Sequence, residues 1–73
     1  MGGYKLGDLV YVLGMRCTIR WLGETEFKEG EWVGVELFLP KGRNDGTVQG
    51  KRYFDCKPNC GMFTRIEIVS KTP

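Results

Sequence analysis

The sequence predicts an all-β fold, built as a small, curled antiparallel sheet or open barrel. Three observations support this prediction. The chain has 73 residues, enough for one domain with a small core. Its eleven glycines indicate many turns, and its apolar residues fall in short runs rich in β-branched and aromatic side chains. A sandwich of two sheets needs about 100 residues, so a single curled sheet is the better prediction.

The first two expected strands form an antiparallel pair. Residues 9–13 are a compact apolar run bounded by polar and glycine residues. In the following segment Cys17, Ile19 and Trp21 alternate with polar residues, so they are expected on one buried face. Residues 15–16 are then the expected turn between the two strands.

The later strands are expected at residues 32–38, 52–54 and 62–65, with 66–69 continuing or closing the sheet. In the first of them Val33, Val35 and Leu37 share one face. Gly34 lies on the other face, where a glycine usually marks close approach of another group. Pro40 ends this strand because it cannot donate to a ladder.

Charge is unevenly distributed along the chain, although the formal net charge is only +2. Residues 23–40 carry five glutamates against one lysine, a balance of −4. Residues 41–65 carry six cations against two aspartates, a balance of +4. The second segment is therefore suited to an acidic partner.

The composition argues against an enzyme or a cofactor-binding protein. There is no histidine, so no Cys-His or Ser-His pair can form, and no phosphate-loop or dinucleotide motif is present. Cys17 is expected to be a small core residue, and with Cys56 and Cys60 it gives only a weak zinc signal. An odd cysteine count and short apolar runs favour a soluble, reducing, cytoplasmic setting.

A glycine-rich polar loop at residues 42–46 is the most informative local feature. Gly42 and Gly46 bracket Arg43, Asn44 and Asp45. Such a loop is either a structural turn or a nest of backbone N–H groups for an anion. The arginine fork suits a carboxylate, and the asparagine amide both donates and accepts. Asp45 would repel an anion, so we expect it to cap backbone N–H groups as Asx turns do.

Aromatic residues outside the predicted core strands complete a candidate site. Phe27 lies in a polar loop, Trp32 on the glycine side of its strand, and Phe63 close to Arg65. Each ring alone could belong to the core. Together with the basic loop they favour a shallow groove for a peptide C-terminus, with rings for its side chain and cations for its carboxylate.

These residues together resemble the CAP-Gly domain, the glycine-rich domain of cytoskeleton-associated proteins. The matching motifs, spread over residues 6–69, are Gly42-Arg43-Asn44-Asp45-Gly46, Phe27-x-x-Gly30-x-Trp32-Val33-Gly34-Val35-Glu36-Leu37, Tyr53-Phe54-x-Cys56 and Gly61-x-Phe63-x-Arg65. The resemblance implies a highly twisted SH3-like barrel. Residues 1–5 and 70–73 would then be linkers or expression-derived ends of an excerpt from a longer protein.

The resemblance also implies a function. Family members bind acidic C-termini ending in Glu-Glu-Tyr or Glu-Glu-Phe, found on α-tubulin, end-binding proteins and cytoplasmic linker proteins. This predicts a monomeric, non-catalytic microtubule-binding module of the cytoplasm and cytoskeleton, without cofactor, metal, membrane or nucleic acid. The implied peptide-binding residues are Phe27, Trp32, Arg43, Asn44, Gln49, Phe63 and Arg65, and the implied loop residues are Gly34, Gly42, Asp45 and Gly46, with no room for a side chain at Gly34 or Gly46.

Five positions depart from the family pattern. Phe38 and Leu39 replace an acidic pair before the proline, Arg43 replaces a lysine, Cys17 a glycine and Ile66 a proline. The first change leaves partner choice open. Two alternatives remain: the docking domain of a tubulin-folding cofactor, and a nucleic-acid-binding SH3-like barrel that uses the basic residues 41–65.

Overall fold

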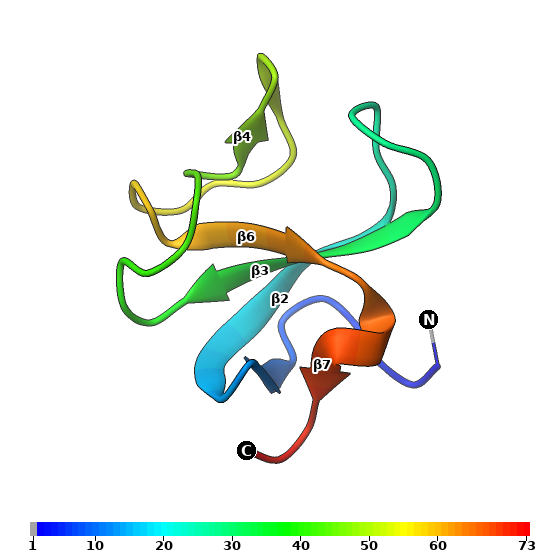
Figure 1. Ribbon diagram of the computed structural model, residues 1–73, viewed down its shortest axis with the longest axis vertical. Coiled ribbons are helices and arrows are strands. Elements are labelled where there is room, and N and C mark those ends of the chain that lie inside the picture. The colour runs from blue at the N-terminus through cyan, green and yellow to red at the C-terminus, as the bar shows by residue number, and fades with distance from the viewer. Residues whose placement is uncertain (1) are drawn as a thin grey trace.

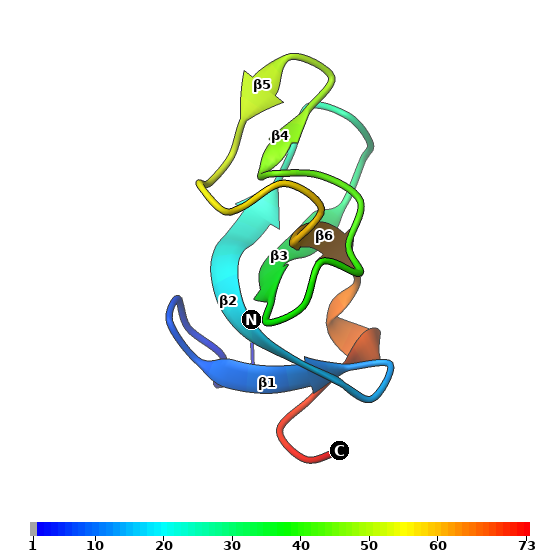
Figure 2. The ribbon, with the colours of Figure 1, turned by 90° about the vertical axis from the view of Figure 1, so that its left-hand side faces the viewer.

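The computed structural model describes residues 2–73 and confirms the all-β prediction. A five-stranded antiparallel sheet has the order β6-β3-β2-β1-β7, and a separate hairpin pairs β4 with β5 (Figures 1 and 2). The strands are β1 (Leu9–Val12), β2 (Met15–Glu24), β3 (Glu31–Leu37), β4 (Thr47–Val48), β5 (Lys51–Arg52), β6 (Gly61–Thr64) and β7 (Val69–Ser70). Figure 2 shows β2 curving along the molecule, which gives the sheet its barrel-like curl.

The hydrophobic core lies on one face of this curled sheet. Its buried residues are Val10, Val12, Cys17, Ile19, Val33, Val35, Leu37 and Val69. They alternate along β1, β2 and β3, as a strand with one buried face requires. The predictions that Cys17 is a core residue and that Val33, Val35 and Leu37 share a face are confirmed.

The predicted face of Trp21 is wrong, and a β-bulge is the reason. Ile19 pairs with Val35 but Trp21 pairs with Gly34, so Arg20 is an extra residue in β2. An extra residue moves every later side chain to the opposite face. Leu22 therefore packs against the core, whereas Trp21 joins the outer face.

The predicted turn at residues 15–16 is also wrong. The β1–β2 turn consists of Leu13 and Gly14, because Val12 already pairs with Met15. Both turn residues have positive φ, 53° and 78°. Two consecutive positive values are the signature of a type I′ turn, whose twist matches that of the flanking strands.

The second half of the chain differs from the prediction between residues 47 and 54. Thr47–Val48 and Lys51–Arg52 pair with each other around the turn residues Gln49 and Gly50, and Tyr53 lies beyond this hairpin. The strand expected at residues 62–65 is present as β6. A 3₁₀ turn, η1 (Ile66–Ile68), then leads into β7, which pairs with β1.

The chain ends take part in the fold at two points. Tyr4 packs against the core, and Ser70 pairs with Tyr11 of β1.

Residues 2–73 contain no helix long and apolar enough to cross a membrane.

Candidate functional site

An aromatic cluster covers the sheet face opposite the core. Phe27 lies in the connection between β2 and β3, Trp32 on β3 and Phe63 on β6. The Phe27 ring centroid is 5.3 Å from that of Trp32 and 5.1 Å from that of Phe63. Tilted and edge-to-face contacts at such distances are favourable beyond the area they bury. The structure therefore brings together three aromatic residues that the sequence singled out.

The cluster also contains three aromatic residues that are not among the predicted site residues. Tyr53 packs edge-on against Trp21 at 5.1 Å and against Phe63 at 5.3 Å, and Phe54 lies 5.6 Å from Phe63. The sequence predicts Tyr53 and Phe54 in a strand at residues 52–54. Only the contact distances between rings, which need the fold, reveal their part in the cluster.

The aromatic cluster packs directly against Gly34 of β3. A Cβ atom at this position would lie 2.7 Å from Phe54 Cε1 and 2.8 Å from Trp21 Cβ. Both distances are too short for real contacts, so no side chain fits here, as expected. The absence of a side chain allows the rings to rest directly on β3.

Three side chains hold the 25–30 connection against the cluster. The backbone N–H of Glu26 donates to Tyr53 Oη at 2.9 Å, and Trp32 Nε1 donates to the Lys28 carbonyl oxygen at 3.1 Å. Arg65 donates from its two terminal nitrogens to the carbonyl oxygens of residues 29 and 31, each at 3.0 Å. Its guanidinium carbon lies 3.8 Å from the Trp32 ring centroid. Arg65 thus fixes one wall of the aromatic surface.

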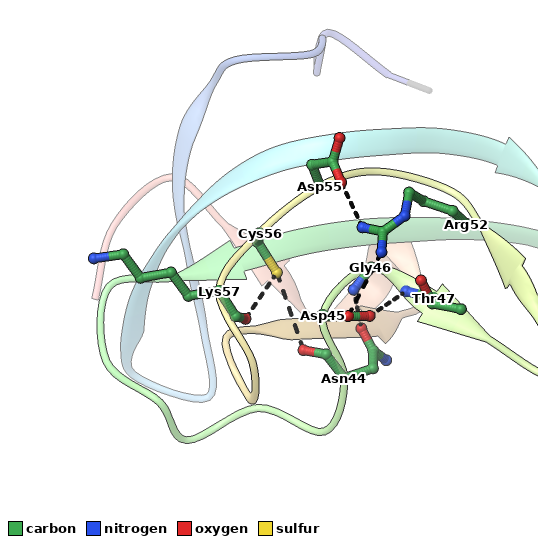
Figure 3. A network of polar contacts seen from close by, with 8 residues as sticks. All are labelled: Asn44, Asp45, Gly46, Thr47, Arg52, Asp55, Cys56 and Lys57. Carbon is green, nitrogen blue, oxygen red and sulfur yellow. Dashed lines mark hydrogen bonds and ion pairs between the residues drawn. The ribbon is translucent and has the colours of Figure 1, made fainter.

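The glycine-rich loop is held by two consecutive Asx-type contacts (Figure 3). Asn44 Oδ1 accepts from the Gly46 N–H at 2.9 Å, and Asp45 Oδ1 accepts from the Thr47 N–H at 3.0 Å. The expected capping role of Asp45 is confirmed. The hydrogen bond from the Thr47 N–H and the charge of the Arg52 guanidinium, 3.7 Å away, keep the pKa of the Asp45 carboxyl below its ordinary value.

Backbone contacts fasten the loop to β6 and to the aromatic cluster. Asn44 bonds in both directions with Gly61, its N–H donating at 3.1 Å and its carbonyl oxygen accepting at 2.7 Å. Gly46 has φ 96°, and a Cβ there would overlap the Phe54 carbonyl group. At Gly42 a Cβ would lie 2.5 Å from the Gly61 carbonyl oxygen. The loop therefore needs glycine at both ends, and the lack of room expected at Gly46 is confirmed.

The loop leaves two groups available for a ligand. Arg43 is exposed, and within residues 2–73 no carboxylate pairs with its guanidinium group. Asn44 uses its amide oxygen in the loop, while its Nδ2 donates to no group of the described chain. Gln49 is the first turn residue of the β4–β5 hairpin, exposed with φ 51°.

The β4–β5 hairpin and the 25–30 connection rise from the same end of the sheet (Figures 1 and 2). Lys51 Nζ lies 2.6 Å from Glu26 Oε2 and 5.6 Å from the Tyr53 ring centroid. The hydrogen bond to Glu26 raises the Lys51 pKa. The acidic and basic segments thus meet beside Tyr53.

The cysteines beside the loop are free thiols. Cys56 Sγ lies 3.4 Å from the Lys57 carbonyl oxygen and 4.0 Å from that of Asn44, and burial raises its pKa to about 11. A neutral thiol is a donor and a poor nucleophile or metal ligand. Within residues 2–73 no group of three or more His, Cys, Asp or Glu side chains is placed to hold a metal ion.

The chain is therefore a small SH3-like β-barrel module that has an aromatic outer face with a glycine-rich loop beside it. The CAP-Gly domain model matches residues 6–69. The chain belongs to the CAP-Gly domain family.

Curated relatives are similar over nearly the whole chain. CAP-Gly domain-containing linker protein 3 of Mus musculus is 51% identical over 70 residues, which are 94% of this chain and 13% of that protein. The Restin homolog of Drosophila melanogaster is 52% identical over 75 residues, covering 97% of this chain and 4% of that protein. Microtubule-associated protein ssm4 of Schizosaccharomyces pombe is 46% identical over 65 residues, covering 89% and 10%. The chain thus spans a small part of the length of each.

Solved structures share the fold. The solution structure of the CAP-Gly domain in human kinesin-like protein KIF13B has a TM-score of 0.89 and 40% identity, covering 99% of this chain and 73% of that one. The Bik1 CAP-Gly domain with ETF peptide from Bim1 has a TM-score of 0.78 and 30% identity, covering 85% and 77%.

Proposed function

We propose that this chain is a non-catalytic module that binds acidic C-terminal peptides ending in tyrosine or phenylalanine. The observation that carries the proposal is the half-buried aromatic cluster bordered by a rigid loop with two free donors, Arg43 and Asn44 Nδ2. Rings offer an apolar contact for an aromatic side chain, and the two donors suit the terminal carboxylate.

Each residue then has a separate role. Phe27, Trp32 and Phe63 contact the final side chain of the peptide, and Arg43 with Asn44 holds its carboxylate. Gln49, on the hairpin tip, adds a polar contact further along the peptide. Arg65 acts chiefly through the wall it fixes, since its terminal nitrogens already donate to two carbonyl oxygens.

The comparisons support a peptide of this type. The Bik1 domain is bound to a peptide called ETF, which in one-letter code places an acidic residue two positions before an aromatic one. Relatives named as a linker protein and as a microtubule-associated protein support a cytoskeletal role in the cytoplasm. We propose the α-tubulin tail, end-binding proteins and cytoplasmic linker proteins as partners.

Calorimetric titration tests this proposal with three peptides: one ending in Glu-Glu-Tyr, the same peptide without its tyrosine, and the same peptide with an amidated C-terminus. We expect micromolar affinity for the first, on the order of −7 to −8 kcal/mol, and at least about tenfold weaker binding for the others. The ionic part should weaken with added salt. Equal affinities for all three peptides would exclude recognition of a carboxylate and a ring.

A further inference from the structure

A second apolar surface surrounds Phe38, at the other end of β3 from Trp32. Phe38 and Leu39 directly follow β3 and are each 59% exposed. Phe38 lies six positions after Trp32 along an extended chain, which corresponds to about 20 Å. The surface is therefore distinct from the aromatic cluster, and its function needs a separate explanation.

Two hollows flank the Phe38 side chain. One, of about 270 Å³, is lined by residues of β2 and β3 together with Lys57 and Cys60. The other, of about 300 Å³, lies between the β1–β2 turn and residues 38–41. Phe38 and Leu37 line both hollows. Each hollow is large enough for one side chain. A surface with two such hollows suits a peptide better than a flat lipid surface.

Positive charge surrounds these hollows. Arg20 and Lys57 line the first hollow, and Arg16 and Lys41 line the second. Their only acidic neighbour in the two linings is Glu36, so the balance of this surface is +3.

The single acid of this surface is already neutralised. Glu36 Oε1 lies 2.9 Å from Arg20 Nε. Over residues 2–73, no carboxylate pairs with Arg16, Lys41 or Lys57. Arg16 instead places its guanidinium carbon 5.4 Å from the Phe38 ring centroid. A partner with carboxylates would therefore find three unpaired cations around an apolar centre.

We propose that the Phe38 surface, defined as Phe38, Leu39, Arg16, Lys41 and Lys57, is a second docking site. Its ligand is an acidic peptide segment with apolar side chains spaced to enter the two hollows. Recognition there involves side chains along the segment and needs no free C-terminus. The site does not depend on the function proposed for the aromatic cluster, because the two surfaces use different residues.

Nuclear magnetic resonance titration of the ¹⁵N-labelled chain tests this second site. The probe is the acetylated, C-terminally amidated peptide Glu-Glu-Leu-Glu-Leu-Glu, which offers neither an aromatic ring nor a terminal carboxylate. We expect saturable shifts at the backbone amides of Arg16, Phe38 and Lys41. The amides of Phe27 and Trp32 should stay in place. A lysine version of the probe should cause no shifts.

Matched variants identify the residues responsible. Phe38→Asp should weaken the probe complex at least about tenfold. Leu6→Asp changes an equally exposed residue, at 62%, that lines neither hollow, and should stay within about twofold. The double variant Arg16→Gln/Lys41→Gln keeps the apolar centre and should remove most of the salt dependence. None of these variants should change titrations with the Glu-Glu-Tyr peptide.

Several results would overturn the second site. Shifts confined to Phe27, Trp32 and Asn44 would assign the probe to the first site, and the absence of saturable shifts would leave the Phe38 surface without a peptide ligand. Binding to phosphatidylserine vesicles without binding to the probe would replace the peptide by a membrane. Shifts of Phe38 that depend only on chain concentration would replace it by a second copy.

Discussion

Asn44 combines a structural role and the proposed binding role in separate atoms. Its Oδ1 accepts from the Gly46 N–H, whereas its Nδ2 is free for a ligand. The two roles can therefore be separated by choosing the replacement. Asn44→Ala removes both, and the lost loop hydrogen bond costs about 0.5–1.5 kcal/mol of stability.

The variant Asn44→Asp gives the sharper prediction. It keeps an oxygen for the Gly46 N–H but replaces the free donor by a negative charge. We expect stability within about 0.5 kcal/mol of the parent and at least tenfold weaker binding of the Glu-Glu-Tyr peptide, since a hydrogen bond to a charged group contributes about 1.5–3 kcal/mol. Urea unfolding and calorimetry measure the two effects. Undiminished binding by Asn44→Asp would exclude this amide from the site.

Asp45 should make the loop sensitive to acid. Its pKa is lower in the folded state than its ordinary value of 3.8, because the hydrogen bond from the Thr47 N–H and the Arg52 charge favour the carboxylate. A carboxyl group whose pKa is lower in the folded state stabilises the folded chain at pH values above the unfolded pKa. This stabilisation is lost as the pH falls through the folded pKa. The free energy of unfolding should therefore decrease below about pH 4.

The comparison with Asp45→Asn isolates this contribution. The amide oxygen of asparagine can still accept from Thr47, but it does not titrate. Unfolding in urea between about pH 5 and pH 3 should show a shallower loss of stability for the variant than for the parent. A carboxyl titration by ¹³C resonance should place the Asp45 pKa below 3.8. Parallel pH profiles for the two chains would contradict this assignment.

At the scale of the elements, alternation predicted the strands but not their irregularities. The pattern in residues 33–37 gave the correct buried face because β3 has no extra residue. The same reasoning failed at Trp21, since the bulge at Arg20 leaves no mark in the order of polar and apolar residues. The β4–β5 hairpin was missed because its turn, Gln49-Gly50, lies inside a segment that reads as one polar loop.

The β1–β2 hairpin contains a correctable strain. Leu13 has φ 53°, a left-handed backbone conformation that is unfavourable for leucine. Its side chain is 74% exposed, so burial of the side chain offsets little of this strain. Asparagine is preferred at this position of a type I′ turn. Leu13→Asn should stabilise the chain by about 0.5–1 kcal/mol in urea unfolding. Leu9→Asn, at an exposed strand position of the same hairpin, should give no gain; equal effects at both positions would contradict the strain argument.

The 25–30 connection depends on the planar fork of Arg65. Lysine would keep the charge but could not donate to the carbonyl oxygens of residues 29 and 31 in the same way. Arg65→Lys should accelerate hydrogen exchange of amides 26–31 about tenfold while global stability changes by less than about 1 kcal/mol. Arg43→Lys is the matched control, since Arg43 is exposed and unpaired within the described chain, and it should leave this exchange unchanged. Identical exchange in both variants would contradict the role of Arg65.

At the scale of the whole molecule, one sheet serves two purposes with its two faces. The face carrying Val33 and Val35 forms the core, and the face carrying Trp32 and Gly34 supports the aromatic cluster. The sequence predicted this division on β3, together with the rings of Phe27, Trp32 and Phe63. It could not predict the packing of Trp21, Tyr53 and Phe54 into the same cluster, because these contacts join segments that only the fold brings together.

Because the two faces are separate, substitutions on each should have different consequences. Ile19→Val removes one methylene group from the core and should cost about 0.5–1.5 kcal/mol of stability. Gly34→Ala places a methyl group against Phe54, Trp21 and Phe63 and should cost about 1–3 kcal/mol by overpacking.

Both variants should stay folded at room temperature, because a domain of this size has about 4–11 kcal/mol of stability. Ile19→Val should then bind the Glu-Glu-Tyr peptide as the parent does, since its change lies on the far side of the sheet from the rings. Gly34→Ala should bind at least about tenfold more weakly, because the displaced rings no longer present the same surface. Unfolding and peptide binding should be measured on the same samples. If the loss of binding follows the loss of stability in both variants, the two faces of the sheet are coupled. That result would exclude the aromatic face as an independent recognition surface.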